Sequence, residues 1–340
     1  MGSRKGKCMV FERPPVLRAA ASVVGKKEGE GPLGHCFDVV NEDAYFGEKT
    51  WEKAEASLQR TSAGLAMQKA ELAPTQVDVV LAGDLINQCT PSTFGLVEFG
   101  IPFIGLFGAC STCAEGLAVG AALLNAGYAK TALCVTSSHF STAERQFRMP
   151  LAYGAQRPPT AQWTVTGSGA FVLDAGMPAK SGEICIRAAL VGKPVDMGIV
   201  DANNMGAAMA PAACDSIQQF LQDMDCTPAS FDLIATGDLG ALGYGIVKDL
   251  LGRDGLVLDN VYDDCGLMIF DRETQEVEAG ASGCACSAVV LAGHLLQQLR
   301  EGILNNVLLV GTGALMSPTS FQQGESIVGI AHCVWLSRQP

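Results

Sequence analysis

Charged residues, and basic ones above all, are scarce in this sequence. Only 17% of its 340 residues are Asp, Glu, Lys or Arg, and 23 basic residues stand against 35 acidic ones, for a formal net charge of -12. Such a chain repels the phosphate backbone of nucleic acids, so no nucleic-acid partner is expected. With 48% hydrophobic residues and a mean hydropathy of +0.24, the chain has enough apolar material for a large core, and intrinsic disorder is excluded.

Apolar segments long enough to span a membrane are also missing. Crossing the hydrocarbon core of a bilayer takes about 20 apolar residues in a row. Two uncharged segments, residues 279–299 and 303–324, contain glycines, glutamines and other polar residues, which is typical of elements buried in a folded core. Near the N-terminus, residues 12–15 (ERPP) interrupt any apolar stretch, so neither a signal peptide nor a transmembrane segment is expected.

The 13 cysteines are too few for a disulfide scaffold in a chain of this length. Without a signal peptide a reducing compartment is expected, and the cysteines should be free thiols. Two pairs stand out, Cys110-Ser-Thr-Cys113 and Cys284-Ala-Cys286. These pairs raise two alternatives, a thioredoxin-like dithiol and a metal or iron–sulfur site. The second pair has C-x-C spacing, which argues against the dithiol. The paired C-x₂-C spacing that is usual for metal and iron–sulfur ligands is missing, which argues against such a site. The segments GSGAF and GTGAL lack nucleotide-binding fingerprints, so no resident metal and no cofactor is expected.

Two segments of the chain repeat each other. Residues 74–85 read PTQVDVVLAGDL and residues 228–239 read PASFDLIATGDL, with five identical residues at an offset of 154. Each copy follows a helical pattern, at residues 51–69 and 208–224, and enters a short apolar run typical of a buried strand. A helix that leads into a buried strand indicates an α/β fold.

A second pair of similar segments follows in the same order. Residues 114–138 and 289–313 each combine a long apolar helix, a glycine that ends it, and a strand rich in Val and Leu. Their offset is 175, so about 21 extra residues are expected in the second half, near residues 259–278. Two such pairs in one order indicate an internal duplication.

The two long apolar helices predict how the layers are arranged. Residues 114–125 and 287–299 are apolar on nearly all sides, which is typical of helices buried between two sheets. The predicted fold class is therefore α/β, with duplicated halves that form a five-layer α/β/α/β/α sandwich around a pseudo-twofold axis. Residues 1–200 are expected to form the N-terminal half, and residues 201–340 the C-terminal half, of one integrated core.

Longer motifs carry a resemblance to known proteins. FGACST, at residues 107–112, enters the first central helix and is similar to the loop of the thiolase and ketoacyl-synthase fold that places a nucleophilic cysteine at a helix N-terminus. More closely, the chain resembles the stage V sporulation protein AD family over essentially its whole length. The segments that carry this resemblance are GPLGHCFD (31–38), LAGDLINQ (81–88), LFGACST (106–112), TSSHFSTAERQFR (136–148), TGSGAFVL (166–173), MAPAACDSI (209–217), DDCGLMIF (263–270), SGCACSAVV (282–290) and VGTGAL (310–315).

The resemblance implies a thiolase-like protein of endospore-forming bacteria that binds dipicolinic acid (pyridine-2,6-dicarboxylate) or its calcium chelate. Members of the family support the uptake of dipicolinic acid, with calcium, into the developing spore. They act with membrane-embedded proteins of the same sporulation operon, which implies a peripheral location at the forespore or spore inner membrane. Thiolase-like halves commonly pair through the edge strand next to the first central helix, so a homodimer is a further expectation.

Cys110 is the candidate nucleophile. It follows an apolar strand at residues 101–107, and the N-terminus of the first central helix is expected to face its sulfur and to lower its pKa. Acyl transfer also needs a base and an oxyanion hole. The resemblance implies His or Asn in two second-half loops, which here read ATGDLG and SGCACS and contain neither. A non-catalytic protein that keeps the pocket is therefore expected. The alternatives are an active ketoacyl-synthase-III-like acyltransferase with Cys110 as nucleophile, and a scaffold whose pocket is vestigial.

Loops at the strand ends of both halves are expected to surround one pocket. Dipicolinic acid has two carboxylates beside a ring nitrogen, so its pocket needs N–H donors, cations and small walls. Helix N-termini at Cys110 and Cys286, and a guanidinium fork from Arg145 and Arg148, would supply the donors and the charge. The predicted ligand-binding residues are Asp84, Cys110, Ser137, His139, Arg145, Arg148, Asp238, Cys284 and Thr312.

Structural roles for several of these residues stay open at this point. Glu144 beside Arg145 suggests an ordinary surface ion pair. Asp84 and Asp238, which coincide in the repeat, are equally suited to cap turns. His139 is either a structural imidazole or a donor to the pocket.

Overall fold

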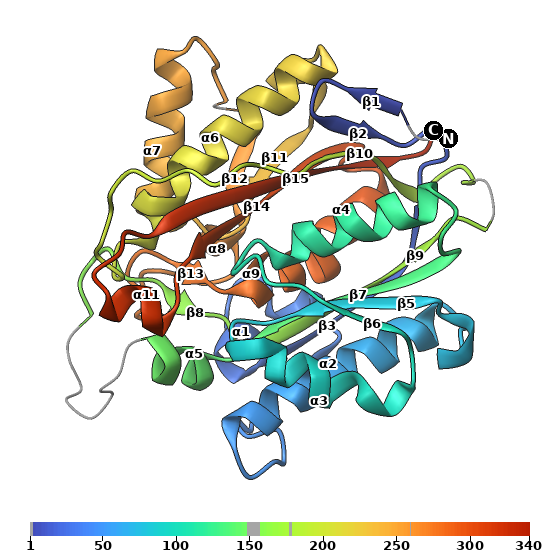
Figure 1. Ribbon diagram of the computed structural model, residues 1–340, viewed down its shortest axis with the longest axis horizontal. Coiled ribbons are helices and arrows are strands. Elements are labelled where there is room, and N and C mark those ends of the chain that lie inside the picture. Colours follow the sequence, from blue (N-terminus) through green and yellow to red (C-terminus); the bar gives the residue numbers. More distant parts are fainter. Residues whose placement is uncertain (1–2, 148–156, 177–178, 259) are drawn as a thin grey trace.

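Five layers, alternating between helices and sheets, make up the protein (Figure 1). The computed structural model describes residues 3–147, 157–176, 179–258 and 260–340. The outer layers are α2 (Trp51–Lys69) with α3 (Thr90–Leu96), and α6 (Met205–Met224) with α7 (Gly240–Arg253). Between the sheets lie α4 (Thr112–Asn125) and a continuous helical segment formed by α9 (Cys284–Val290), η7 (Leu291–Leu295) and α10 (Leu296–Glu301). The predicted five-layer α/β/α/β/α architecture is confirmed.

One path of hydrogen-bonded strands runs through both sheet layers, in the order β12-β11-β14-β15-β10-β3-β9-β7-β5-β6. The first sheet layer contains β3 (Val16–Gly25), β9 (Gly167–Asp174), β7 (Thr131–Ser138), β5 (Val79–Gly83) and β6 (Phe103–Gly105). The second contains β10 (Ile184–Leu190), β15 (Val328–Arg338), β14 (Asn306–Leu315), β11 (Leu233–Thr236) and β12 (Tyr262–Asp264). The two layers meet where Val16 of β3 pairs with Cys185 of β10.

Shorter helices and strands lie between and beside these longer elements. They are β1 (Ser3–Lys5), β2 (Cys8–Val10), α1 (Lys26–Gly29), η1 (Gly34–Cys36), β4 (Val39–Asn41), α5 (Phe140–Phe147), β8 (Trp163–Thr164), α8 (Cys265–Met268), β13 (Ala281–Ser282) and α11 (Pro318–Gln322). Both α8 and β13 lie between β12 and α9; α8 lies within residues 259–278, where the repeat predicts extra residues, and β13 follows them.

The element order repeats as the duplication predicts. β3, α2, β5, α3, β6, α4, β7 and β9 correspond in order to β10, α6, β11, α7, β12, α9, β14 and β15. β10 lies within residues 1–200 of the chain, yet it pairs with β15 over most of its length, besides its pairs with β3 and β2. The first 200 residues therefore contribute β10, with β2 and β1 beside it, to the sheet layer whose other strands come from the second half.

Polar residues set the ends of the long outer helices. The Thr50 side chain accepts a hydrogen bond from the backbone N–H of Lys53 at the start of α2, and Asn204 accepts one from Ala207 at the start of α6. Such caps satisfy backbone donors that the first helical turn leaves without a partner. Asp225, in a left-handed conformation with φ of 55°, ends α6.

Bare glycine backbone lets the central helices approach both sheets. A Cβ on Gly169 of β9 would lie 2.7 Å from the backbone of Ala288 in α9, and one on Gly311 of β14 would lie 2.5 Å from the Cβ of Ala114 in α4. Each central helix thus crosses a glycine of the sheet from the other half. Most leucines of both helices, such as Leu117, are fully buried, and each of these contributes about 2 kcal/mol through removal of apolar surface from water.

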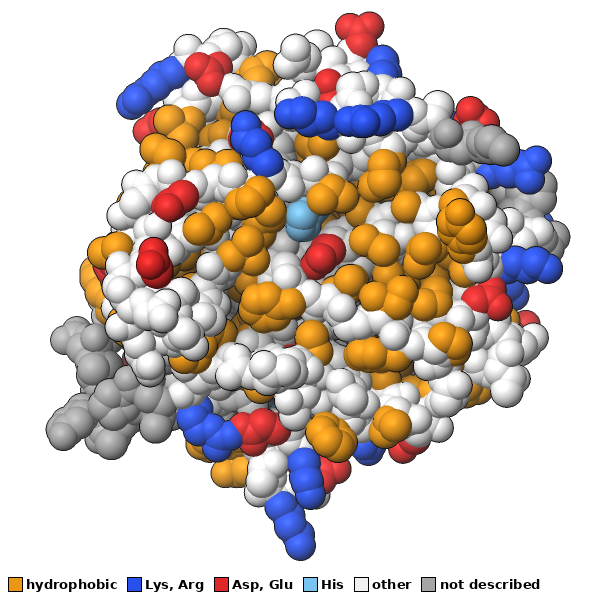
Figure 2. All heavy atoms as spheres, in the orientation of Figure 1, with side chains coloured by type: hydrophobic (Ala, Val, Ile, Leu, Met, Phe, Trp, Pro, Cys, Tyr) orange, Lys and Arg blue, Asp and Glu red, His pale blue; other side chains and the backbone are white. Residues whose placement is uncertain are grey.

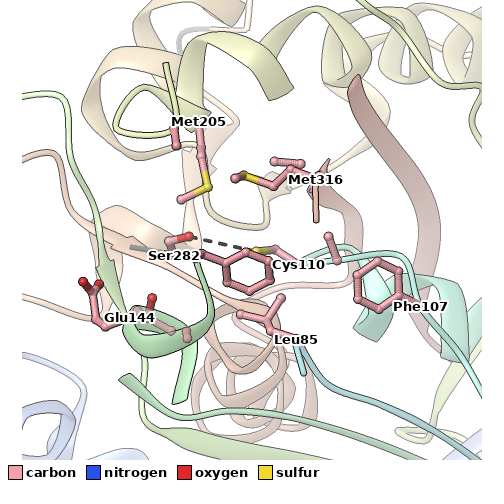
Figure 3. Close-up of a pocket in the computed structure, with 13 residues that line it drawn as sticks. Leu85, Phe107, Cys110, Glu144, Met205, Ser282 and Met316 are labelled. Carbon is pink, nitrogen blue, oxygen red and sulfur yellow. Dashed lines mark hydrogen bonds between the residues drawn. The ribbon is translucent and has the colours of Figure 1, made fainter. Parts of the chain in front are cut away.

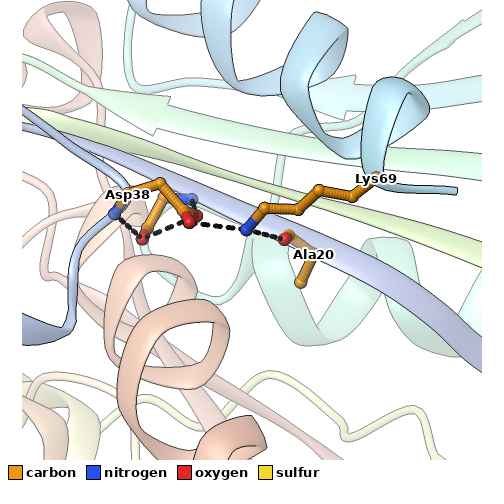
Figure 4. Close-up of polar contacts among 4 residues, drawn as sticks. Ala20, Asp38 and Lys69 are labelled. Atoms are coloured by element: carbon orange, nitrogen blue, oxygen red, sulfur yellow. Dashed lines mark hydrogen bonds and ion pairs between the residues drawn. The ribbon is translucent and has the colours of Figure 1, made fainter.

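A polar cluster joins three elements at the edge of the first sheet layer (Figure 4). The Asp38 carboxylate accepts hydrogen bonds from the Ser22 N–H at 2.9 Å and from the Lys69 ammonium at 2.5 Å. The same ammonium donates to the carbonyl of Ala20 at 2.9 Å. Lys69 at the end of α2 is therefore tied both to β3 and to the loop before β4.

Three further observations concern sites and membranes. The 13 cysteines are free thiols. Among the described residues, no three His, Cys, Asp or Glu side chains are grouped so that they could hold a metal ion. None of the helices in this part of the chain is long and apolar enough to cross a bilayer.

Candidate functional site

A small cavity of about 40 Å³, open to solvent at its mouth, lies at the N-terminus of α4 between the two halves (Figure 3). Its wall is mostly apolar, as is typical of small-molecule sites. The lining residues are Leu85, Phe107, Ala109, Cys110, Ala143, Glu144, Phe147, Thr164, Ala202, Met205, Ser282, Ala314 and Met316. In Figure 3, Met205 and Met316 lie on one side of Cys110 and Leu85 lies on the other.

Cys110 lies in the cavity wall just before α4. The preceding residue, Ala109, has a φ of 50°, a left-handed conformation that is uncommon for a residue other than glycine. The Cys110 sulfur lies 3.9 Å from the Ser282 hydroxyl. Burial, and then the carboxylate of Asp238, raise the pKa of Cys110 well above its usual value. The sequence-based expectation of a lowered pKa is wrong, because desolvation and a negative neighbour outweigh the field of the helix N-terminus.

Asp238 is held firmly beside Cys110. Its carboxylate accepts hydrogen bonds from the Thr312 hydroxyl at 2.8 Å and from the Gly283 N–H at 2.9 Å. Its negative charge acts on the neighbouring Cys110 thiol. Full burial raises the pKa of Asp238 to about 7, although these donors act in the opposite direction. The structure therefore brings together three predicted residues, Asp238, Cys110 and Thr312, from both halves of the chain.

Cys284 completes this group from the start of α9. Its thiol donates to the carbonyl of Ala109 at 2.9 Å, and the side chain packs with Cys110, Leu85 and Ala143. Burial raises its pKa well above the usual value. Cys284 thus supports the loop that carries Cys110. Cys286, proposed as a second helix N-terminus facing the ligand, lies within α9 in the hydrophobic core.

Asp84 and Ser137 belong to a separate buried polar cluster. The Asp84 carboxylate accepts hydrogen bonds from the Ile86 N–H and from both the N–H and the hydroxyl of Ser92 in α3, at 2.8, 3.0 and 2.5 Å. The Ser137 hydroxyl donates to Glu55 at 2.9 Å. Burial raises the pKa of Asp84 to about 6 and that of Glu55 to about 8. Asp84 thus caps the start of α3, and a contact of either predicted residue with ligand stays a prediction.

His139 has its partners away from the Cys110 cavity. Its Nε2 lies 2.8 Å from the carbonyl oxygen of Ala44, and its Nδ1 accepts from the N–H of Ser141 at 3.1 Å. Burial lowers the pKa of His139. A neutral ring that donates through Nε2 and accepts through Nδ1 fits this arrangement, which has the contacts of a structural imidazole.

The two predicted arginines do not complete a guanidinium fork among the described residues. Arg145 forms an ion pair with Glu52 and lies over the ring of Trp51, 5.6 Å from its centroid. Glu144, the neighbour expected to pair with Arg145, forms an ion pair with Arg157 at 2.8 Å instead. Arg148 lies outside the described residues.

Several cavity residues were not among the predicted ligand-binding residues. Glu144 and Ser282 lie in motifs that carried the family resemblance, so their positions were available to sequence reasoning. Met205 and Met316 come from segments without a recognisable motif, and long-range folding alone brings them to Cys110.

The chain is similar in sequence to one protein family and similar in fold to a set of solved structures. The family profile of stage V sporulation protein AD matches residues 5–337. The chain is 49% identical over 329 residues to the stage V sporulation protein AD of Bacillus subtilis (strain 168), and the alignment covers 97% of this chain and 96% of that protein.

Solved structures resemble the chain in fold. The 3-oxoacyl-[acyl-carrier-protein] synthase III of Aquifex aeolicus VF5 superposes with a TM-score of 0.58 at 12% identity, over 95% of this chain and 99% of the enzyme. The corresponding enzyme of Pseudomonas aeruginosa PAO1 gives a TM-score of 0.57 at 19% identity, over 96% and 99%. The predicted thiolase-like fold is confirmed. At such low identities, the likeness to these enzymes concerns the fold and not the activity.

Proposed function

This chain belongs to the stage V sporulation protein AD family, and on that premise we propose that it is a non-catalytic thiolase-fold protein that binds dipicolinic acid. In this proposal the cavity beside Cys110 holds the ligand, and the protein supports uptake of dipicolinic acid, with calcium, into the developing spore. The observation that carries the proposal is the environment of the cysteine.

That environment opposes nucleophilic catalysis. An acyl-transfer cysteine reacts as a thiolate, activated by a base or by positive charge. Here the Cys110 thiol is buried beside the carboxylate of Asp238, so a thiolate would place two negative charges near each other in a dry site. The chain's four histidines do not supply a base, because their rings contact Ala44, Gly192 and Cys36 instead.

The cavity suits a planar aromatic ligand with polar substituents. Phe107, Met205 and Met316 offer an apolar and polarisable surface for a ring. Ser282 and Thr164 place hydroxyl groups in the same wall. The N-terminus of α4 adds the positive end of a 14-residue helix, which favours bound anions.

Isothermal titration with dipicolinic acid, with and without calcium, tests the proposal. Ala143→Leu places extra methyl groups into the cavity wall and should lower the affinity at least about tenfold, a loss of roughly 1.4 kcal/mol. Ala126→Leu is the matched control, since this residue is exposed at the end of α4, and it should leave the affinity unchanged. Failure of the wild-type protein to bind, or equal binding by both variants, would contradict the proposed ligand or the proposed site.

The acyltransferase alternative is favoured by the placement of Cys110 at a helix N-terminus after a left-handed residue. Incubation with acyl-CoA followed by mass spectrometry distinguishes the two functions. A non-catalytic protein should show no acyl adduct on Cys110. An adduct that is lost in Cys110→Ser and turns over to product would establish an enzyme. A protein with neither adduct nor ligand would be a scaffold.

Uptake and location follow from family membership within this proposal. The protein acts with membrane-embedded proteins of the same sporulation operon and lies peripherally at the forespore or spore inner membrane. Spores that carry Ala143→Leu in place of the wild-type residue should contain less dipicolinic acid and less calcium. In cell fractionation, the wild-type chain should accompany the inner membrane and be released when the membrane-embedded partners are deleted. Recovery in the soluble fraction of wild-type spores would contradict this location.

A homodimer is proposed through the edge strand β6. Phe103 and Ile104 of β6 are 41% and 40% exposed, and Phe107 just beyond it is 47% exposed. β6 ends the strand order, so one side of it lacks a neighbouring strand among the described residues. Figure 2 shows apolar side chains gathered on one face of the molecule. Sedimentation or light scattering should give a dimer that Ile104→Lys dissociates, because a buried charge opposes edge pairing; a wild-type monomer would refute the proposal.

A further inference from the structure

The cavity wall contains one charged side chain among the residues that the structure describes, the carboxylate of Glu144 on α5. Its Oε1 lies 2.8 Å from Nη2 of Arg157, and the two side chains are 6% and 22% exposed. In Figure 3, Glu144 lies on the opposite side of the cavity from Phe107. A cation therefore stands next to the one acidic group that an entering ligand meets.

Arg157 is held in place from several directions. Its Nη1 donates to the carbonyl of Gln162 at 3.0 Å. Its guanidinium carbon lies 4.9 Å from the ring centroid of Trp163 and 5.2 Å from that of Phe140, and these two rings are stacked 4.0 Å apart. Gln162 in turn donates to the carbonyl of Asp238 at 2.7 Å. The guanidinium is thus fixed before any ligand arrives, and a fixed donor loses little conformational freedom on binding.

The charges of this pair matter for an anionic ligand. A dicarboxylate in the cavity is repelled by Glu144 and attracted by Arg157, and both effects are strong in a largely buried site. A ligand carboxylate that replaces Glu144 on the guanidinium preserves the planar, charge-assisted pairing that Arg157 already makes. Starting from the proposed function, we infer that Arg157 binds a carboxylate of the aromatic ligand in exchange for Glu144. Glu144 is then an internal competitor for the cation.

The two possible roles of the ion pair, exchange with the ligand and a purely structural role, predict opposite effects of Glu144→Gln on ligand affinity. If the pair only stabilises the fold, removal of either partner weakens ligand binding or leaves it unchanged. If Arg157 binds the ligand, Arg157→Met weakens binding, whereas Glu144→Gln strengthens it, because the repulsion and the competition both disappear. Hydrogen bonds to charged groups are worth enough for changes of roughly tenfold to a hundredfold in affinity.

The experiment is isothermal titration of the full chain with pyridine-2,6-dicarboxylate and with its uncharged diamide. For the dicarboxylate, Glu144→Gln should bind at least about fivefold more tightly and Arg157→Met at least about tenfold more weakly than wild type. Arg157→Lys, which keeps the charge but loses the planar fork, should lie between Arg157→Met and wild type. Glu144→Gln should gain much less affinity in the Arg157→Met background than in wild type, because only the repulsion is left to remove. The diamide should distinguish little among the variants. Thermal unfolding of each variant checks the fold.

The outcomes separate this inference from the proposed function. If wild type binds the dicarboxylate but Glu144→Gln binds equally or more weakly, or Arg157→Lys and Arg157→Met bind as wild type does, the exchange is refuted and the proposed function stands. If wild type binds neither compound, the proposed function fails and the exchange fails with it. A gain from Glu144→Gln that is equally large without Arg157 would assign the effect to repulsion alone and would also refute the exchange.

Discussion

Asp238→Asn should flatten the dependence of stability on pH. Burial raises the pKa of Asp238 from 3.8 to about 7, so the folded protein favours the protonated carboxyl group. The stabilisation from this preference is complete below pH 4, where the unfolded chain is protonated too, and it is lost as the pH rises through 7. Asparagine does not titrate and removes this contribution.

The expected magnitude follows from the size of the shift. A displacement of about three pKa units corresponds to about 4 kcal/mol over the whole titration. Between pH 5 and pH 8 the folded protein releases about one proton more than the unfolded chain, which amounts to about 2–3 kcal/mol. Asparagine keeps only one of the two acceptor oxygens that serve the Gly283 N–H and the Thr312 hydroxyl, and this loss lowers the stability by a similar amount at every pH.

Urea unfolding at pH 5, 6, 7 and 8 and constant ionic strength measures the effect. The quantity of interest is the difference between wild type and variant, because other buried groups titrate in both proteins. One of them is His332, whose pKa is lowered to about 4 by burial and whose contribution is therefore lost as the pH falls. Asp78→Asn is the control: N–H donors lower the pKa of Asp78, so its titration lies below this range. Parallel curves for wild type and Asp238→Asn would refute the reasoning.

Three other results are expected. Asp238→Asn removes a negative neighbour that raises the pKa of Cys110, so alkylation of Cys110 at pH 8, followed by mass spectrometry, should become severalfold faster; an unchanged rate would assign the shift to burial alone. Gly169→Ala places a methyl group against Ala288 of α9 and should lower the free energy of unfolding, measured in urea, by about 1–3 kcal/mol. An unchanged free energy would mean that α9 can shift to make room. Lys69→Met should lower the free energy of unfolding by about 1 kcal/mol, because the ion pair of Lys69 is partly exposed. An unaltered unfolding midpoint would show that these contacts do not contribute to stability.

Periodic and repeated patterns predicted the frame of the fold. The helix predicted at residues 51–69 has those limits, and the central helices predicted at 114–125 and 287–299 lie within α4 and the α9–α10 segment. These patterns report local geometry and burial, which short stretches of sequence contain. The pairing of β10 with β15 joins distant segments, so no local signal indicates it.

The site was predictable where the repeat placed loops together. Cys110, Asp238, Cys284 and Thr312 do meet, because corresponding strand ends converge around the pseudo-twofold axis. The pKa of Cys110 was not predictable from its helix, since burial and a neighbour from the other half decide it. The ion-pair partners of the arginines were equally hidden, because they depend on tertiary contacts.

The position of β10 has a consequence for how the chain is completed during synthesis. β10 leaves the ribosome well before β15, its antiparallel neighbour at residues 328–338. Until β15 arrives, β10 has an unpaired edge, and the central helices lack part of one covering sheet. Exposed edges and apolar helices are what chaperones and proteases recognise in nascent chains. Translation stalled before residue 328 should therefore leave a product that is degraded rapidly. Pairing of β15 with β10 is then the step that completes the core.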